Sequence, residues 1–437
     1  MKKVMSIVWL LSIILVCCKK EDQVAVPAST SDSVQVAART NVKQLGVITN
    51  SPNCQSAHIQ SLIASNKTLY FPKGTYVIET PINISGVNNL NIIGDEGTVF
   101  KTMGNKIFNI YGSVSKLEIK NIKFVSTNVS TIEDPEGLIS IWSYGDNDLM
   151  DGIKIWYCKF TIPNSPANGI KLISEGSNSL IKNVSVINNR FESIGRMAVE
   201  FQNHNTRTMK ARYSNYNISN NYFYDIGTIQ LYQAACCVSV SGYSLNGKIN
   251  NNTMIDMRMD KTPYVYYGIE NAGTCNLETI GNRIKATVYG FTGILGSNPS
   301  VVKTNWVIKD NVIELTGSNP DKVRIRAMEL SYVSDYTITN NTMNTDGYAL
   351  RFIDCKNGVI TNNKAISRTG FVVDFEAGSA KNTISLNSFT SKGPDSPVVI
   401  FNGATTRGNV AYQNVLTKAN NLPGCYLDVN GASNDTK

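Results

Sequence analysis

The chain has 437 residues, of which 42% are hydrophobic and 17% are charged, and its formal net charge is +8. This composition supports a large hydrophobic core and does not indicate a disordered chain. The basic residues form no Lys/Arg run with interleaved aromatic residues, so we expect no nucleic-acid partner despite the positive charge.

The first 20 residues, MKKVMSIVWLLSIILVCCKK, combine a basic start with a short apolar run and two cysteines. This pattern is typical of an export signal and not of a membrane-spanning helix. Residues 15–18 resemble a bacterial lipobox, which implies cleavage and lipidation at Cys18, or at Cys17. We therefore predict a lipoprotein signal peptide over 1–18 and a polar tether over 19–44. A lipid anchor then holds the exported protein at the bacterial cell envelope; the alternative is a soluble secreted protein.

Residues that bind metals are scarce in the rest of the chain. Seven cysteines follow Cys18, none of them in a C-x-x-C or His-flanked spacing, and the two histidines are His58 and His204. We therefore predict no metal site from these residue types. Most of the cysteines are expected to be small buried hydrophobic residues.

One short pattern repeats along the chain: an apolar residue, a polar residue, asparagines and another apolar run. It occurs as ISNNYF (218–223), INNNTM (249–254) and ITNNTM (338–343). The last asparagine of the motif recurs every 22 to 32 residues, at Asn189, Asn221, Asn252, Asn282, Asn311, Asn341, Asn363, Asn387 and Asn414. Each interval holds three short β-like runs separated by Gly, Asn, Asp or Ser, with no amphipathic run of helical length.

Units of this kind cannot bury their apolar faces alone, but they share one core when they are stacked. An asparagine at the same turn of every coil can hydrogen-bond to its copy in the next coil, and Asn tolerates the left-handed backbone of tight turns. The pattern therefore predicts an all-β chain that forms a single-stranded parallel β-helix, a solenoid with asparagine at one corner.

Residues 56–78, SAHIQSLIASNKTLYFPKGTYVI, predict a short capping helix followed by a strand with the pattern FPxGxY at 71–76. The cap and the repeat resemble the right-handed parallel β-helices of the pectate-lyase-like superfamily, over about residues 45–430. The resemblance implies one right-handed β-helix domain over 45–437. It implies no single reaction, because this scaffold carries polysaccharide lyases, glycoside hydrolases and phage tail-spike proteins.

The longest strand of each coil carries charged residues at its outward positions. Alternation places apolar residues such as Ile170, Phe201 and Leu330 in the core, so the residues between them point outward to solvent. From coil to coil this outward column consists of Lys171, Glu200, Ser239, Glu270, Gly293, Glu329, Arg351 and Asp374. Adjacent coils are about 4.8 Å apart, so carboxylates two coils apart have backbones roughly 9–10 Å apart. This separation suits the two carboxylates of an inverting glycoside hydrolase, with Ser239 and Gly293 leaving room for a sugar ring.

The same column also fits a structural role. Glu329, Arg351 and Asp374 follow one another on successive coils, and this acid–base–acid order is typical of a surface salt-bridge ladder. Glu200 and Glu270 have no facing cation at the same position, which favours a functional role for these two residues.

Two long polar loops flank this face of the predicted helix. The loop at 202–217 contributes His204 and Arg207, and the loop at 256–267 contributes Tyr267. Tyrosine rings pack on sugars, and basic side chains match carboxylate or sulfate groups. We assign substrate binding to Lys171, Arg351, Asp374, His204, Arg207 and Tyr267.

Three hypotheses about function follow. The first is a monomeric, surface-anchored enzyme without a cofactor that hydrolyses an acidic polysaccharide, with Glu200, Glu270 and Glu329 as general acid and base. The second is a polysaccharide lyase, in which Lys171, His204 or a loop tyrosine is the base, Arg351 or Arg207 neutralises a uronate, and the glutamate column holds calcium. Ser239 and Gly293 separate these acids, which departs from the acidic cluster of calcium-dependent lyases. The third is a non-catalytic, glycan-binding or adhesive β-helix, and the residues leave all three open.

Overall fold

The computed structural model describes residues 39–132, 136–202, 212–229, 234–257, 266–287, 291–297, 301, 303–316, 325–393, 397–403, 405–429 and 434–436. The predicted signal peptide with Cys18 and most of the predicted tether lie outside these ranges, as do His204 and Arg207. No helix in the described part of the chain is long and apolar enough to cross a membrane.

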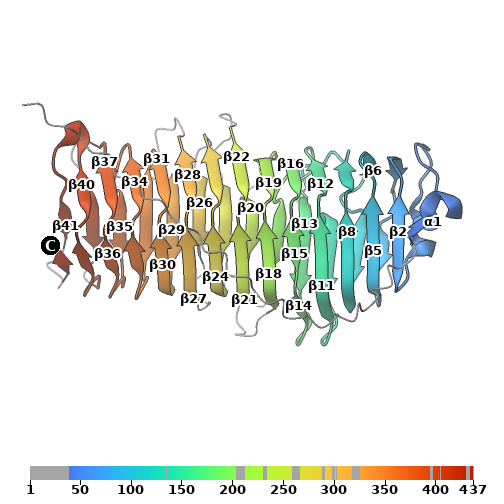
Figure 1. The fold of residues 1–437 in the computed structure, drawn as a ribbon, viewed down its shortest axis with the longest axis horizontal. Coiled ribbons are helices and arrows are strands. Elements are labelled where there is room, and N and C mark those ends of the chain that lie inside the picture. The colour runs from blue at the N-terminus through green and yellow to red at the C-terminus, as the bar shows by residue number, and fades with distance from the viewer. Residues whose placement is uncertain are drawn as a thin grey trace, which may run out of the picture. The chain divides into compact units, whose positions relative to one another are not determined.

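Three parallel sheets run side by side, and the coils contribute strands to them in turn (Figure 1). Sheet A consists of β1 (Arg39–Asn41), β2 (Lys67–Phe71), β5 (Asn88–Gly94), β8 (Val114–Lys120), β11 (Leu149–Trp156), β14 (Leu180–Lys182), β15 (Ser185–Ile187), β18 (Tyr213–Ser219), β21 (Ser244–Asn250), β24 (Thr274–Ile280), β27 (Lys303–Lys309), β30 (Val333–Thr339), β33 (Val359–Thr361), β36 (Thr383–Ser385), β39 (Val410–Tyr412) and β42 (Asp435–Thr436). Sheet B consists of β3 (Gly74–Val77), β6 (Thr98–Thr102), β9 (Lys123–Ser126), β12 (Lys159–Ile162), β16 (Arg190–Ile194), β19 (Tyr222–Ile226), β22 (Thr253–Asp256), β25 (Arg283–Ala286), β28 (Val312–Leu315), β31 (Thr342–Thr345), β34 (Lys364–Ser367), β37 (Ser388–Ser391) and β40 (Val415–Thr417). Sheet C consists of β4 (Ile82–Ile84), β7 (Phe108–Tyr111), β10 (Gly137–Ser143), β13 (Asn168–Ser174), β17 (Val199–Gln202), β20 (Ala235–Val240), β23 (Tyr266–Asn271), β26 (Phe291–Gly296), β29 (Arg326–Ser331), β32 (Tyr348–Ile353), β35 (Val373–Glu376), β38 (Val399–Asn402) and β41 (Tyr426–Asp428). Strands pair in parallel with the equivalent strands of neighbouring coils, which confirms the predicted parallel β-helix.

The core consists of inward side chains that stack from coil to coil. Phe124, Phe160, Phe191 and Phe223 of sheet B are fully buried at the same position of four successive coils. Their ring centroids are separated by 5.1, 4.7 and 5.0 Å, and the planes are nearly parallel. Each such burial contributes roughly 1.5–3 kcal/mol to folding, so the stacking of coils is what stabilises each short strand.

The predicted asparagine ladder is present at the turn between sheets A and B. The backbone N–H and the side-chain amide of Asn189 both donate to Oδ1 of Asn221, at 2.9 and 3.2 Å. The same pattern continues through Asn252, Asn282, Asn311, Asn341, Asn363, Asn387 and Asn414. The residue before each ladder asparagine is left-handed, as at Asn220 with φ of 57°. Asparagine doublets recur because Asn suits both positions of this turn.

The N-terminal end of the β-helix is covered by η1 (Val42–Leu45) and α1 (Ser56–Leu62), and η3 (Ala419–Asn421) lies near the C-terminus. Val42 of η1 and Ile59 of α1 are fully buried and join the hydrophobic core. Strand β1 pairs in parallel with β2, with Arg39 opposite Thr68. Residues 39–44 therefore belong to the β-helix, and the predicted end of the tether at residue 44 is too late.

Candidate active site

The outward column of sheet C contains seven of the eight residues predicted for it. The pairs across adjacent strands are Lys171–Glu200, Glu200–Ser239, Ser239–Glu270, Glu329–Arg351 and Arg351–Asp374. The strands therefore bring these side chains onto one face, as alternation along each strand predicts.

Gly293 was wrongly placed in this column. In β26, Leu295 pairs with both Glu270 and Glu329, while Ile294 pairs with the core residues on either side. Gly293 lies within β26, two residues before Leu295, where an added Cβ would come within 2.6 Å of the Ala327 carbonyl oxygen. An apolar side chain, and not an open gap, therefore separates Glu270 from Glu329. It divides the column into a Glu270 cluster (Asn168, Lys171, Arg196, Glu200, Cys236, Ser239 and Glu270) and an Asp374 cluster (Arg326, Glu329, Tyr348, Arg351, Asp374 and Glu376).

The sequence predicts that the column is exposed to solvent, and this prediction is wrong for three of its charged residues. Lys171 is 0% exposed, Glu200 is 4% exposed and Asp374 is 3% exposed. They point away from the core, but they are covered and contact other polar side chains. Buried charges require partners, so the contacts of each residue decide what it can do chemically.

Glu200 is held by three donors on one oxygen. Its Oε2 atom accepts from Asn168 Nδ2 at 3.0 Å, from Arg196 Nη1 at 3.1 Å and from Lys171 Nζ. Lys171 also donates to Oε1 of Gln202. The expectation that Glu200 lacks a facing cation is therefore wrong, because Lys171 of the adjacent strand pairs with it directly.

Glu270 has a different environment from Glu200. Ser239 Oγ donates to its Oε2 atom at 2.7 Å, and Cys236 Sγ lies 3.8 Å from the same oxygen. Burial raises the pKa of Glu270; the Ser239 hydrogen bond opposes this shift and the negative charge of Glu200 adds to it. A half-buried carboxyl that holds its proton above the usual range is suited to general acid catalysis.

Glu329 and Arg351 form part of the predicted salt-bridge ladder, but Asp374 does not complete it. Glu329 Oε2 lies 2.5 Å from Arg326 Nη1 and 3.1 Å from Arg351 Nη1. The other side of Arg351 pairs with Glu376, which takes the place expected for Asp374. Burial, then the hydrogen bond and negative charge of Glu376, raise the pKa of Asp374 to about 8.

Sequence reasoning missed four charged or polar residues of this face. They are Asn168, Arg196, Arg326 and Glu376. Glu376 follows Asp374 by two residues, so the period of the strand could have revealed it. Asn168 and Arg326 are the first residues of β13 and β29, and Arg196 precedes β17. At these strand starts the alternation of inward and outward residues has not yet begun, so it gives no signal.

Tyr267 lies between the two clusters, opposite Cys236 on one strand and Thr292 on the other. Burial raises the pKa of Tyr267, and the charges of Glu270 and Glu329 act in the same direction. This tyrosine therefore borders both carboxyls. Arg212 and Tyr213, from the end of the first predicted loop, are buried instead, and Arg212 donates to the backbone carbonyls of Gly176 and Ser177.

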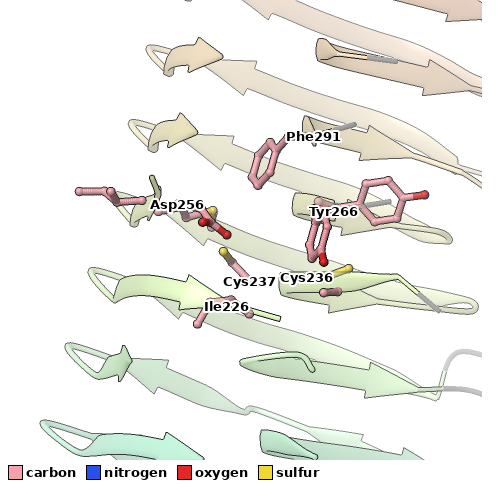
Figure 2. A pocket seen from close by; sticks show the side chains of 10 residues that line it. Ile226, Cys236, Cys237, Asp256, Tyr266 and Phe291 are labelled. Carbon is pink, nitrogen blue, oxygen red and sulfur yellow. The ribbon is translucent and has the colours of Figure 1, made fainter. Parts of the chain in front are cut away.

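A small apolar cavity lies beneath this region, lined by residues that include Ile226, Cys237, Asp256 and Phe291 (Figure 2). Its volume is about 10 Å³, which is room for at most one water molecule. A sugar cannot enter it, so the outward surface and not this cavity is the candidate site. No group of three or more His, Cys, Asp or Glu side chains is arranged to hold a metal ion within the described ranges.

Comparison with known proteins identifies the family of this chain. No curated protein matches the chain in sequence. Among solved structures, an α-1,3-glucanase of glycoside hydrolase family 87 from Streptomyces thermodiastaticus shares 17% identity and a TM-score of 0.60, covering 92% of this chain and 69% of its own. The A-module of the mannuronan C-5 epimerase AlgE6 from Azotobacter vinelandii shares 14% identity and a TM-score of 0.54, covering 91% and 99%. At these identities the likeness is one of fold. Residues 39–276, more than half of the chain, match the family model described as rhamnogalacturonase A/epimerase, pectate lyase-like, and the chain belongs to that family.

Proposed function

We propose that the protein is a glycoside hydrolase that cuts an acidic polysaccharide on the outward face of sheet C. The observation that carries this proposal is a pair of carboxyls two coils apart. Glu270 has a raised pKa, and Glu329 is held by two guanidinium groups. The family, and structural neighbours named as a glucanase and a mannuronan epimerase, support a polysaccharide as the substrate.

In this proposal Glu270 donates its proton to the glycosidic oxygen as the bond to the leaving sugar breaks. Glu329 takes a proton from a water molecule, and the resulting hydroxide bonds to the anomeric carbon from the opposite side. Two coils separate the backbones by about 10 Å, and carboxyls roughly 6.5–9.5 Å apart leave room for such a water. The product would therefore have inverted configuration at the anomeric carbon.

Glu200 has a positioning role in this scheme and not the catalytic role first expected. It is buried, and one of its oxygens already accepts from three donors, so water has poor access to it. Its charge instead helps Glu270 to keep its proton. Leu295 would form an apolar floor under the sugar ring, and Tyr267 would border the ring.

The charge balance of the two clusters favours an acidic substrate. Their four cations are Lys171, Arg196, Arg326 and Arg351. The carboxylates are Glu200, Glu329 and Glu376 when Glu270 and Asp374 hold their protons. One positive charge remains in excess, and a sugar carboxylate or sulfate would balance it.

The contacts of two residues speak against the lyase alternative. Lys171 is paired with Glu200, and Arg351 makes a two-bonded pair with Glu376. An elimination base at Lys171 would have to break its buried pair with Glu200. A uronate bound to Arg351 would have to displace Glu376 from a half-buried pair. The lyase roles that rest on His204 and Arg207 concern residues outside the described ranges, and no observation favours the purely adhesive alternative.

The experiment is mass spectrometry of products from a panel of acidic and neutral polysaccharides. We expect products that have gained one water, and a loss of kcat/KM of about 10²–10⁴ in Glu270→Gln and Glu329→Gln. Glu278→Gln on sheet A, where Glu278 pairs with Lys248, is the matched control and should retain full activity. Unsaturated products, or full activity of Glu270→Gln, would contradict the proposal.

We also propose, from the N-terminal sequence, that a lipid on Cys18 anchors the protein at the bacterial cell envelope. Replacing both Cys17 and Cys18 with Ala should then release the protein into the soluble fraction. Recovery of that variant in the membrane fraction would contradict the anchor.

A further inference from the structure

A second surface, remote in the fold from sheet C, has the features of a ligand site. It is an open groove of about 430 Å³ at the turn between sheets A and B, near the N-terminal end. Its lining includes Glu96, Gly97, Asn121, Lys123, Tyr157 and Lys159. We call it the Tyr157 groove.

Tyr157 occupies a backbone position that other coils give to a different residue type. It is left-handed, with φ of 53°, and 51% of its surface is exposed. Equivalent positions in other coils hold Asn121, Asn188, Asn220, Asn251, Asn340, Asn362, Asp310 and Gly281, and the exceptions besides Tyr157 are Leu386 and Gln413. Asn and Gly are favoured there because they tolerate the left-handed region, whereas a bulky residue is strained.

The fold does not explain the choice of tyrosine at this position. The Tyr157 ring contacts Trp156, with centroids 5.0 Å apart, but half of its surface remains in solvent. A strained aromatic residue that is exposed beside a groove is a reason to look for a function. Tyrosine offers an apolar face to sugar C–H groups and a hydroxyl to their oxygens.

The basic side chains that border the groove outnumber the carboxylates that pair with them. Lys123, Lys159 and Arg190 stand opposite one another on three successive strands, β9, β12 and β16. Glu192 pairs with both Lys159 and Arg190, and it pairs with no third cation in the described residues. Like charges in register are unfavourable in a sheet, so this row is suited to a bound anion.

The remaining charges of the groove do not cancel this excess. Glu96 lines it on one side, and the side chain of Lys73 lies over Gly97 on the same side. Four cations therefore face two carboxylates. Lys123 forms no ion pair within the described part of the chain, which leaves its ammonium group available.

We propose that the Tyr157 groove binds an acidic glycan, with a sugar ring packed on Tyr157 and its carboxylate or sulfate group paired with Lys123. The site is separate from the proposed hydrolytic face and does not depend on it. It would hold an acidic chain to the enzyme at a second point, which raises the apparent affinity for long substrates.

The test is equilibrium binding of full-length protein to polygalacturonate, dextran sulfate and dextran. Polygalacturonate and dextran sulfate distinguish a carboxylate from a sulfate ligand, and dextran controls for the neutral chain. Tyr157→Asn restores the common residue of the turn, so it should keep or increase the melting temperature. Lys123→Gln removes the unpaired cation without changing the backbone.

Matched controls exist at equivalent positions far along the chain. Leu386→Asn relieves the same backbone strain outside the groove, since Leu386 has φ of 58° and is 53% exposed. Lys364→Gln removes an exposed lysine from the first residue of β34, the position that Lys123 has in β9. Glu270→Gln reports on the hydrolytic face independently.

We expect Tyr157→Asn and Lys123→Gln each to weaken binding of at least one acidic probe by tenfold or more. Leu386→Asn and Lys364→Gln should bind as the wild type does, and dextran should not bind. Wild-type affinity in both groove variants, an equal loss in the control variants, or no binding of either acidic probe would overturn the proposal. Because Glu270→Gln tests hydrolysis alone, failure of the proposed reaction would be seen separately.

Discussion

Arg351 and Glu376 form a two-bonded ion pair across adjacent strands of sheet C, with Nε donating to Oε1 and Nη2 to Oε2, each at 2.8 Å. Asp374 stands directly opposite Arg351 in the sheet, yet it forms no ion pair among the described residues. Its carboxyl hydrogen-bonds to Glu376 instead. The Oδ1 atom of Asp374 is buried and has no hydrogen-bond partner in the described structure. Two carboxyls that hydrogen-bond to each other share a proton more readily than they carry two charges.

Replacing Asp374 with Asn should remove a pH dependence of stability. Burial, then the hydrogen bond and charge of Glu376, raise the pKa of Asp374 from 3.8 to about 8. The folded protein therefore holds this proton between about pH 4 and 8, where the unfolded chain has lost it. This contribution is fully present below pH 4 and is lost as pH rises towards 8, with a limiting slope of about 1.4 kcal/mol per pH unit. Urea unfolding at pH 5 and pH 8 measures it.

The neutral amide of Asp374→Asn has no such slope, so the variant should gain stability relative to the wild type between pH 5 and pH 8. Asp310→Asn is the control, because Asp310 is exposed and its left-handed backbone suits Asn equally well. A constant difference between the wild type and Asp374→Asn at the two pH values would show that Asp374 is ionised in the folded protein.

Ser239 and Glu200 should move the pH profile of catalysis in opposite directions. The hydrogen bond from Ser239 lowers the pKa of Glu270, and the charge of Glu200 raises it, both acting on a carboxyl whose pKa burial has raised. A general acid is active while protonated, so kcat/KM falls at high pH. Ser239→Ala should therefore shift the alkaline limb of the kcat/KM profile to higher pH, and Glu200→Gln should shift it to lower pH.

This measurement separates positioning from structural damage. A variant that only disturbs the fold lowers kcat without moving the limb. Ser388→Ala, at an exposed position of sheet B, should leave both the rate and the profile unchanged. Shifts of Ser239→Ala and Glu200→Gln in the same direction would exclude Glu270 as the acid that both residues tune.

The fold could be predicted because its periodic signal is redundant. Each ladder asparagine marks one turn, and the apolar residues on either side fix which side chains face inward. The prediction failed at Gly293, which lies two residues before Leu295, the residue that occupies the column. Residues two apart in a strand face the same side, so alternation alone does not distinguish them. A single ambiguous strand of this kind shifts its register without disturbing the strands around it.

The partners within the site could not be predicted from the column alone. Asp374 and Glu376 are both outward, and a long arginine side chain can reach either of them. Whether it pairs with one or the other depends on packing around the strand, which period-two alternation does not describe. The burial of Lys171 depends in the same way on Glu200 and Gln202, which accept from its ammonium group, and on the cover over that part of the face.

The asparagine ladder should be a main source of stability. Asn282 accepts the backbone N–H and the side-chain amide of Asn252, both at 3.0 Å, and donates to the carbonyl of Ile249 at 2.7 Å. Asn282→Ala leaves these buried groups without partners, at roughly 1–3 kcal/mol each, so we expect a loss of about 3 kcal/mol or more. The control lies in a second ladder, where exposed Asn276 bonds to Asn246 and Asn305. Asn276→Gly suits its φ of 59° and should cost less than about 1 kcal/mol, because water replaces the lost partners. Urea unfolding of both variants measures the difference, and equal losses would mean that backbone pairing, and not the buried asparagine ladder, holds the coils together.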